Sequence, residues 1–154
     1  MKLLYGERIG KSGELAISCV GLVFDSTRSK VLLVRRTDNN QWCLPGGFMQ
    51  AGETISEACE REVWEETGLE VRANRLVGIY SNPNILATYE NGNQFHVVVA
   101  VCEVEFIQGQ LKPSHETSHL HYFARSEIGD LGLVAYHQEQ IEDGFAFSSN
   151  TLLK

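Results

Sequence analysis

Seven glutamates crowd a short stretch of this chain, and carboxylates at such spacings could bind a divalent cation. Arg61 is the only basic residue among them, and the seven are Glu53, Glu57, Glu60, Glu62, Glu65, Glu66 and Glu70. On a helix of about 3.6 residues per turn, the carboxylates at positions 62, 65 and 66 fall within about 100° of arc. Their repulsion costs roughly 0.2–0.5 kcal/mol per pair, and a bound cation would reverse its sign. Mg²⁺ is commonly held by carboxylates together with phosphate oxygens of a substrate.

The alternative interpretation is a solvated acidic helix face, the ordinary outcome for a glutamate-rich helix. Three features favour a metal site instead. The carboxylates share a helix face with the apolar Ala58 and Cys59, so they need not face bulk water. A Pro-Gly-Gly loop at residues 45–47 precedes the helix and offers backbone carbonyls as ligands. Arg61 lies between acids, as expected for a side chain that pairs with Glu53 and braces the loop.

The elements that must position these residues follow from local patterns. Residues 15–24 and 30–36 are rich in β-branched and aliphatic side chains, flank a polar stretch, and predict a β-hairpin. Residues 44–47 follow as a loop whose proline and paired glycines allow close backbone approach. Residues 54–57 form a capping-box pattern that opens a helix, and Gly68 is placed to close it.

The second half of the chain is predicted to contain mostly strands. Residues 69–79 have an extended pattern, and Asn91-Gly92 predicts a tight turn between residues 85–90 and 93–106. Residues 119–123 form a further strand. Residues 133–143 have helical spacing, with Gly144 as the stop. Many strands and two clear helices predict an α/β (α+β) fold with a mixed sheet between helices, and nothing divides the single domain of residues 1–154.

Composition excludes several classes of protein. The 154 residues are 43% hydrophobic and 21% charged, as in an ordinary globular domain that can bury a core. A net charge of −7 disfavours nucleic-acid binding, which needs a basic surface. The longest apolar run, residues 97–102, is too short to cross a bilayer, and the first residues lack a signal-peptide pattern. Four scattered cysteines suit reduced thiols, so we expect a cytoplasmic protein that contacts no membrane.

Residues 47–69, GFMQAGETISEACEREVWEETGL, resemble the Nudix box. That motif is a glycine, five residues, a glutamate, seven residues, and then Arg-Glu-aliphatic-x-Glu-Glu-x-Gly-aliphatic. Its defined positions are all filled, by Gly47, Glu53, Arg61, Glu62, Val63, Glu65, Glu66, Gly68 and Leu69. So many defined positions make a specific signal. A looser resemblance to the Nudix hydrolase family extends from about residue 17 to residue 131 and includes the Leu-Pro-Gly-Gly run before the box.

The resemblance implies the Nudix fold and the family's reaction. Nudix enzymes use Mg²⁺ or Mn²⁺ to hydrolyse a nucleoside diphosphate linked to another group X, releasing a nucleoside monophosphate and phosphorylated X. Glu62 and Glu66 would be the main carboxylate ligands, Glu65 would assist, and the Gly46 carbonyl would complete the shell. The structural residues of the box would be Gly47, Glu53, Arg61 and Gly68.

The identity of the general base remains open. Glu62 is the first candidate, with its neighbour Glu65 and the more distant Glu116, Glu103 and Glu105 behind it. For the distant three, an ordinary surface acid is the alternative. Each is a carboxylate that could take a proton from water if it lay close to the reacting phosphate.

The sequence identifies the residues that contact the substrate less specifically than it identifies the metal ligands. Arg35 and Arg36 end a strand just before the box and could contact phosphate or ribose, with simple exposure as the alternative for one of them. Tyr80 could stack on a base, with core packing as the alternative. Further rings that could stack, with core packing as the alternative, are Trp42, Tyr89 and Phe95.

The small-molecule substrate is favoured to be ADP-ribose or a nucleotide sugar. The rival enzymatic interpretation is a pyrophosphohydrolase of normal or oxidised nucleoside triphosphates. A rival of another class is a nucleotide sensor that does not cleave, and the complete set of box carboxylates disfavours it. RNA decapping would need a basic track for the transcript, which the negative charge disfavours. A homodimer is common in the family and is left open.

A second motif is interpreted as a chance match. Residues 115–119, HETSH, spell the HExxH pattern of zinc peptidases. That chemistry requires both histidines on one face of a helix and a third ligand downstream. Pro113 precedes the pentapeptide and residues 119–123 alternate like a strand, so the motif predicts no zinc site.

Overall fold

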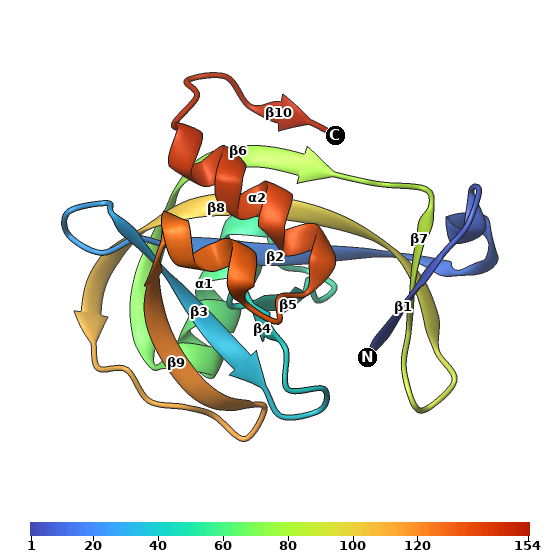
Figure 1. Ribbon diagram of the computed structural model, residues 1–154, viewed down its shortest axis with the longest axis horizontal. Helices are drawn as coiled ribbons and strands as arrows, with labels where there is room; N and C mark the ends of the chain where they lie inside the picture. The colour runs from blue at the N-terminus through green and yellow to red at the C-terminus, as the bar shows by residue number, and fades with distance from the viewer.

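The computed structural model describes residues 1–154 and is built mainly of strands (Figure 1). Its elements are β1 (Lys2–Tyr5), η1 (Ile9–Ser12), β2 (Glu14–Val23), β3 (Lys30–Arg36), β4 (Trp42–Cys43), β5 (Gly46–Phe48), α1 (Ile55–Thr67), β6 (Leu69–Tyr80), β7 (Ile85–Thr88), β8 (Gln94–Gly109), β9 (Thr117–Ala124), η2 (Arg125–Asp130), α2 (Ala135–Ala146) and β10 (Leu152–Leu153). Ten strands and two α-helices confirm the predicted α+β composition.

The strands form two sheets. The larger has the order β1-β7-β8-β2-β5, with β6 paired to β8 and β10 paired to β6, and the smaller has the order β4-β3-β9. β2 is parallel to β8 along its whole length, whereas β6 and β7 are antiparallel to β8. The larger sheet is therefore mixed, as predicted.

Residues 19–23 of β2 and 99–102 of β8 are buried on both faces of the sheet, which explains the continuous apolar sequence of these segments. Because side chains alternate along a strand, Cys19 and Cys102 join the core beside α1. Leu22 and Val101 join the core that includes Ile141 of α2. The two helices thus cover opposite faces of the sheet, and α2 crosses the nearer face in Figure 1.

The hairpin predicted over residues 15–36 is wrong. β2 and β3 belong to different sheets and share only a single bridge, between Phe24 and Val31. Each strand has a longer partner elsewhere, since β2 pairs with β8 and β3 pairs with β9. The polar stretch between them turns the chain from one sheet to the other, with Arg28 in the left-handed region at φ 57°.

The loop predicted at residues 44–47 is only partly correct. Gly46 and Gly47 lie in β5, opposite Val20 and Cys19 of β2. A Cβ atom on Gly46 would approach Cys19 O to 2.5 Å, so the paired glycines allow the close approach that the sequence predicted.

The capping box and the stop of α1 are confirmed. Thr54 Oγ1 accepts a hydrogen bond from the Glu57 N–H, and a Glu57 carboxylate oxygen accepts one from the Thr54 N–H. Gly68 ends the helix in the left-handed conformation at φ 75°. The predicted strands at residues 69–79 and 119–123 lie in β6 and β9, and the Asn91-Gly92 turn joins β7 to β8.

Gly144 was predicted to end the second helix, and this is wrong. The helix begins at Ala135 and continues to Ala146, with Phe147 as its cap at φ 48°. Gly144 faces the core instead, where an added Cβ would lie 2.6 Å from Leu22 Cδ1. The glycine is therefore required by the close packing of α2 on β2.

All four cysteines are buried, and none forms a disulfide. Neither α-helix is both long and apolar enough to span a bilayer.

Replacing Gly144 with alanine is expected to lower the free energy of unfolding by about 1–3 kcal/mol, because the added methyl group overlaps Leu22. Urea unfolding followed by circular dichroism measures the change. The matched control is Gly132→Ala, since nothing lies within 4 Å of a Cβ there. That substitution should change stability by no more than about 0.5 kcal/mol. Equal stabilities for the two variants would contradict the packing argument.

Candidate active site

A broad cavity of about 1090 Å³ opens between α1, β5 and the segment that leads into β9. We call it the carboxylate cavity. It brings together most of the site residues predicted from the sequence, which are Arg36, Gly46, Gly47, Arg61, Glu62, Glu65, Glu66, Gly68 and Glu116. The predicted clustering of carboxylates at positions 62, 65 and 66 is therefore present.

Glu66 is the most deeply buried of these carboxylates, with 6% of its surface exposed. One of its oxygens accepts a hydrogen bond of 2.9 Å from the Gly46 N–H, and no basic side chain forms an ion pair with it. Burial raises the pKa of Glu66 to about 7. The Gly46 hydrogen bond opposes that rise, and the neighbouring Glu62 charge adds to it.

Glu62 lies beside β5 and is also half-buried. Its Oε1 accepts a 2.6 Å hydrogen bond from Arg61 Nη1. Burial raises the pKa of Glu62 above its ordinary value, and the Arg61 guanidinium opposes the rise. A Cβ atom on Gly47 would lie 2.5 Å from Glu62 Oε2, so only glycine at position 47 leaves room for this carboxylate.

Arg61 ties the loop before α1 to the helix. Its guanidinium donates to both carboxylate oxygens of Glu53, to the Phe48 carbonyl, to Glu62 and to Glu65. The ion pair predicted between Arg61 and Glu53 is present, and it lowers the pKa of Glu53 to about 2. One guanidinium thus neutralises part of the charge of three carboxylates, while Glu66 has no cationic partner.

This charge imbalance fits a divalent cation. The side chains alone form no group of three or more metal-binding residues close enough to enclose an ion. Mg²⁺ does not require such a cage, because it keeps several waters and binds through one or two carboxylates plus phosphate oxygens. The half-buried Glu62 and the unpaired, buried Glu66 are the residues whose repulsion a cation would relieve.

Basic groups at the cavity rim suit a phosphorylated ligand. Arg36 is fixed by a two-point ion pair with Asp38, at 2.8 and 2.9 Å. Lys112 lines the cavity without an ion pair of its own. An anionic substrate would therefore meet two cationic side chains beside the carboxylates.

Aromatic side chains form the side of the cavity next to β5. Phe48 and Tyr89 both line it, with ring centroids 6.1 Å apart, and Phe95 packs on both rings. Tyr89 is thus the one stacking candidate from the sequence that lines the carboxylate cavity.

Other predicted substrate contacts lie elsewhere. Arg35 donates to the Asn40 carbonyl and does not line the carboxylate cavity. The Tyr80 hydroxyl donates to Asp143 on the α2 side of the sheet, in a different cavity. Trp42 packs edge-on against Phe123. Strand pairing turns these side chains away from the box, and local sequence patterns do not reveal which strands pair.

The carboxylates considered as general bases lie in different parts of the fold. Glu103 is held by Arg28 and Arg75, and neither Glu103 nor the exposed Glu105 lines the carboxylate cavity, which leaves both as ordinary acids. Glu116 lines the carboxylate cavity at its exposed rim, with its nearest ionisable partner, His115, at 3.4 Å. The HExxH pentapeptide runs from a loop into β9 rather than along a helix, so the geometry of a zinc peptidase is absent.

Several cavity residues were not predicted as site residues. Phe48, Gln50 and Trp64 occupy variable positions of the box, His115 belongs to the HExxH pattern, and Gln110 and Lys112 lie outside any motif. The segment after β8 reaches the site because it folds back over the end of α1, where a Cβ on Gly68 would lie 2.7 Å from Gln110 O. That contact depends on tertiary structure, and local patterns do not encode it.

The family model of the NUDIX domain matches residues 15–144. The chain belongs to the Nudix family. A relative from Methanocaldococcus jannaschii, named ADP-ribose pyrophosphatase, is 34% identical over 116 residues, which are 73% of this chain and 63% of the relative. A Psychrobacter cryohalolentis protein named RNA pyrophosphohydrolase is 38% identical over 60 residues, 39% of this chain and 35% of that protein. This Nudix chain therefore matches less than two thirds of either relative's length.

Solved structures agree on the Nudix fold. A MutT protein from Methanosarcina mazei is 26% identical, with a TM-score of 0.69 over 87% of this chain and 94% of that one. An ADP-ribose pyrophosphatase from Streptococcus suis has a TM-score of 0.71 at 23% identity, over 90% of this chain and 96% of that one, and supports the fold alone.

The raised pKa of Glu66 predicts a pH dependence of stability in the presence of a chelator. Between pH 4.5 and about 7 the folded protein binds the Glu66 proton more tightly than the unfolded chain does. Stability contributed by this group is therefore lost as the pH rises through that window, by up to about 3 kcal/mol. Glu66→Gln should remove this loss, and urea unfolding of both proteins at pH 4.5 to 8 measures the difference. Parallel pH profiles would contradict the prediction.

Proposed function

We propose that this Nudix protein is a metal-dependent pyrophosphohydrolase. It cleaves the diphosphate linkage of a nucleoside diphosphate attached to a group X and releases a nucleoside monophosphate and phosphorylated X. The observation that carries the proposal is a pair of carboxylates, the buried Glu66 beside Gly46 and the half-buried Glu62 beside Gly47, in a cavity whose rim holds Arg36 and Lys112. Membership of the Nudix family supports the reaction class.

The metal would be Mg²⁺ or Mn²⁺, bound by Glu62 and Glu66 with help from Glu65 and the Gly46 carbonyl. When bound, such an ion neutralises diphosphate charge and lowers the pKa of water. Arg61 holds Glu62 in place and tethers the helix to the loop, so it acts as a positioning residue.

Other residues of the carboxylate cavity would bind the phosphates and supply the general base. Arg36, held rigid by Asp38, and the unpaired Lys112 would bind phosphate oxygens and orient the diphosphate. Glu62 is the favoured general base, because it lies in the carboxylate cavity and burial raises the pKa of its carboxyl group. Glu65 and Glu116 are alternatives, of which Glu116 lies in the more exposed position.

The favoured substrate is ADP-ribose or a nucleotide sugar. The name of the Methanocaldococcus jannaschii relative supports this choice, while the RNA pyrophosphohydrolase name keeps RNA as a competing substrate. Normal or oxidised nucleoside triphosphates are the second candidate class. Four free buried thiols support a reducing compartment, and we place the protein in the cytoplasm.

A substrate screen on purified protein tests the proposal. ADP-ribose, nucleotide sugars, dinucleoside polyphosphates, NADH and normal or oxidised nucleoside triphosphates are each offered with Mg²⁺ or Mn²⁺, and products are separated by chromatography. We expect one class to release a monophosphate only when the metal is present. Glu62→Gln and Glu66→Gln should each lower kcat by about 10²- to 10⁴-fold.

The matched control is Glu105→Gln, an exposed acid on β8 outside the carboxylate cavity, which should leave kcat unchanged. Full activity of both cavity variants would contradict the metal assignment. Absence of hydrolysis across the panel, with nucleotide binding retained, would support a sensor instead.

A further inference from the structure

Tyr89 is held in the wall of the carboxylate cavity by the turn between β7 and β8. Its carbonyl accepts a hydrogen bond of 3.0 Å from the Gly92 N–H, and its N–H donates one of 3.0 Å to the Asn93 carbonyl. The Asn91 side chain closes the same turn by accepting a hydrogen bond from the Asn93 N–H. The turn therefore fixes the backbone that carries the Tyr89 ring.

Two phenylalanine rings fix the orientation of the Tyr89 side chain. The Phe95 ring meets it nearly edge-on, with centroids 5.8 Å apart and planes at 75°, and the Phe48 centroid lies 6.1 Å from that of Tyr89. Phe48 and Phe95 also pack on each other, with centroids 5.2 Å apart. Such aromatic pairs each contribute about 0.5–1.5 kcal/mol beyond the burial of their area. The ring is therefore positioned before any ligand binds.

The hydroxyl of Tyr89 is available to a ligand. All hydrogen bonds of this residue are made by its backbone, and its half-buried side chain lines the cavity. Burial raises the pKa of the phenol, and the Arg36 guanidinium opposes that rise. The phenol is therefore protonated at neutral pH and can donate a hydrogen bond.

Arg36 presents a free guanidinium nitrogen in the same wall. Its Nε and Nη2 donate to the two carboxylate oxygens of Asp38, which leaves Nη1 without a partner. Arg36 and Tyr89 both line the carboxylate cavity, and both also line a small space of about 60 Å³ beside it. A charged N–H donor and a neutral hydroxyl donor are therefore neighbours in one wall of the cavity.

Such a pair of donors matches a phosphate oxygen. Hydrogen bonds to an ionised acceptor are roughly twice as strong as those between neutral groups. A second basic side chain at this place would be repelled by Arg36, whereas the neutral phenol donates without that cost. The hydroxyl thus distinguishes Tyr89 from Phe48, the other ring in this wall, which has no polar atom.

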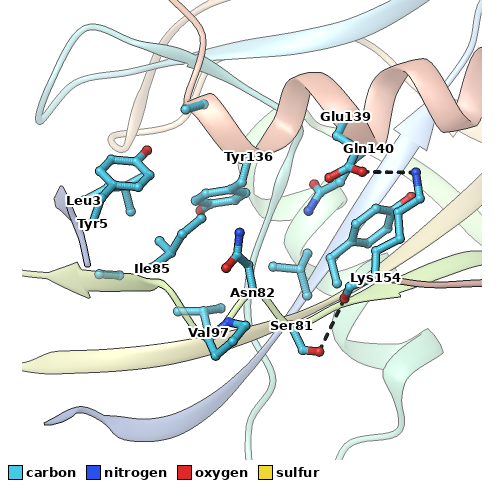
Figure 2. Close-up of a pocket in the computed structure, with 15 residues that line it drawn as sticks. Leu3, Tyr5, Ser81, Asn82, Ile85, Val97, Tyr136, Glu139, Gln140 and Lys154 are labelled. Carbon is cyan, nitrogen blue, oxygen red and sulfur yellow. Dashed lines mark hydrogen bonds and ion pairs between the residues drawn. The ribbon is translucent and has the colours of Figure 1, made fainter. Parts of the chain in front are cut away.

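The cavity between α2 and the larger sheet, of about 660 Å³, offers an anion no such pair. Lys154 is the one basic residue that lines it, and this side chain forms ion pairs with Glu139 and Asp143. Figure 2 shows the Glu139 and Lys154 side chains together at one end of this cavity. The Tyr80 hydroxyl already donates to Asp143. The free donors for a phosphate therefore lie in the carboxylate cavity.

We propose that Tyr89 is a substrate-binding residue, whose hydroxyl donates to a non-bridging phosphate oxygen that the Arg36 guanidinium also contacts. This inference rests on the proposed function, because it concerns the substrate of the same cavity. Glu62 and Glu66 would hold the metal, while Tyr89 and Arg36 hold the diphosphate directly. Tyr89 thus acts as a hydrogen-bond donor rather than as a stacking ring.

Nuclear magnetic resonance of the protein labelled with ¹³C at the ζ carbon of tyrosine tests this contact without catalysis. The chain has five tyrosines, and Tyr89→Phe identifies the Tyr89 signal by its loss. Methylenediphosphonate, a diphosphate analogue that cannot be hydrolysed, is titrated together with Mg²⁺. It should shift the Tyr89 signal and leave that of Tyr122, which lines a different cavity, unchanged. An unmoved Tyr89 signal overturns the proposal, whether or not other residues of the cavity respond.

Kinetics with the substrate found in the screen provide the second test. Tyr89→Phe keeps the ring and removes the hydroxyl, so it should raise KM about tenfold with kcat nearly unchanged. The matched control is Tyr122→Phe, the same change at a half-buried tyrosine on β9 outside the carboxylate cavity, which should leave KM unchanged. Equal KM values for Tyr89→Phe and the unmodified protein would overturn the assignment.

The two proposals fail in different ways. A shift of the Tyr89 signal by the diphosphonate, in a protein that hydrolyses nothing, would refute the enzymatic function and retain the phosphate contact. Hydrolysis that depends on Glu62, with an unmoved Tyr89 signal and an unchanged KM for Tyr89→Phe, would retain the enzyme and refute the role of Tyr89.

Discussion

The burial of negative charge at the start of β5 is the constraint on which the rest of the site depends. Glu66 lies against the Gly46 N–H, and Glu62 lies so close to Gly47 that no side chain fits there. Carboxylates in such a position repel each other and resist ionisation. The Arg61 guanidinium offsets part of the energetic cost of burying these charges. The negative charge that remains explains why a cation with an anionic substrate would bind here.

The same constraint explains the arrangement of the surrounding backbone. Arg61 holds the loop before α1 by bonding to Glu53 and to the Phe48 carbonyl, so the helix and β5 keep a fixed distance. The capping box at Thr54 starts the helix at the residue that places its carboxylates toward β5. Rigid elements, rather than a flexible loop, therefore set the geometry of the proposed metal ligands.

The central sheet separates two regions of different chemistry. On the α1 side lies a charged, open cavity, and on the α2 side lies an apolar one with paired charges and a free amide. Arg36 and Tyr136 both line a third, small space of about 60 Å³.

The features that the sequence by itself determined depend on the spacing of residues that lie close together along the chain. The helix over residues 55–67, its capping box, its glycine stop and the Glu53–Arg61 pair all depend on contacts within about one loop and one helix, which residue order encodes directly. Only the tertiary structure decided which strands pair. It therefore placed Tyr80 far from the box, brought Lys112 to it, and buried Gly144 against Leu22. Those placements come from long-range strand pairing and packing, and no local pattern specifies the partner of a strand that is apolar on both faces.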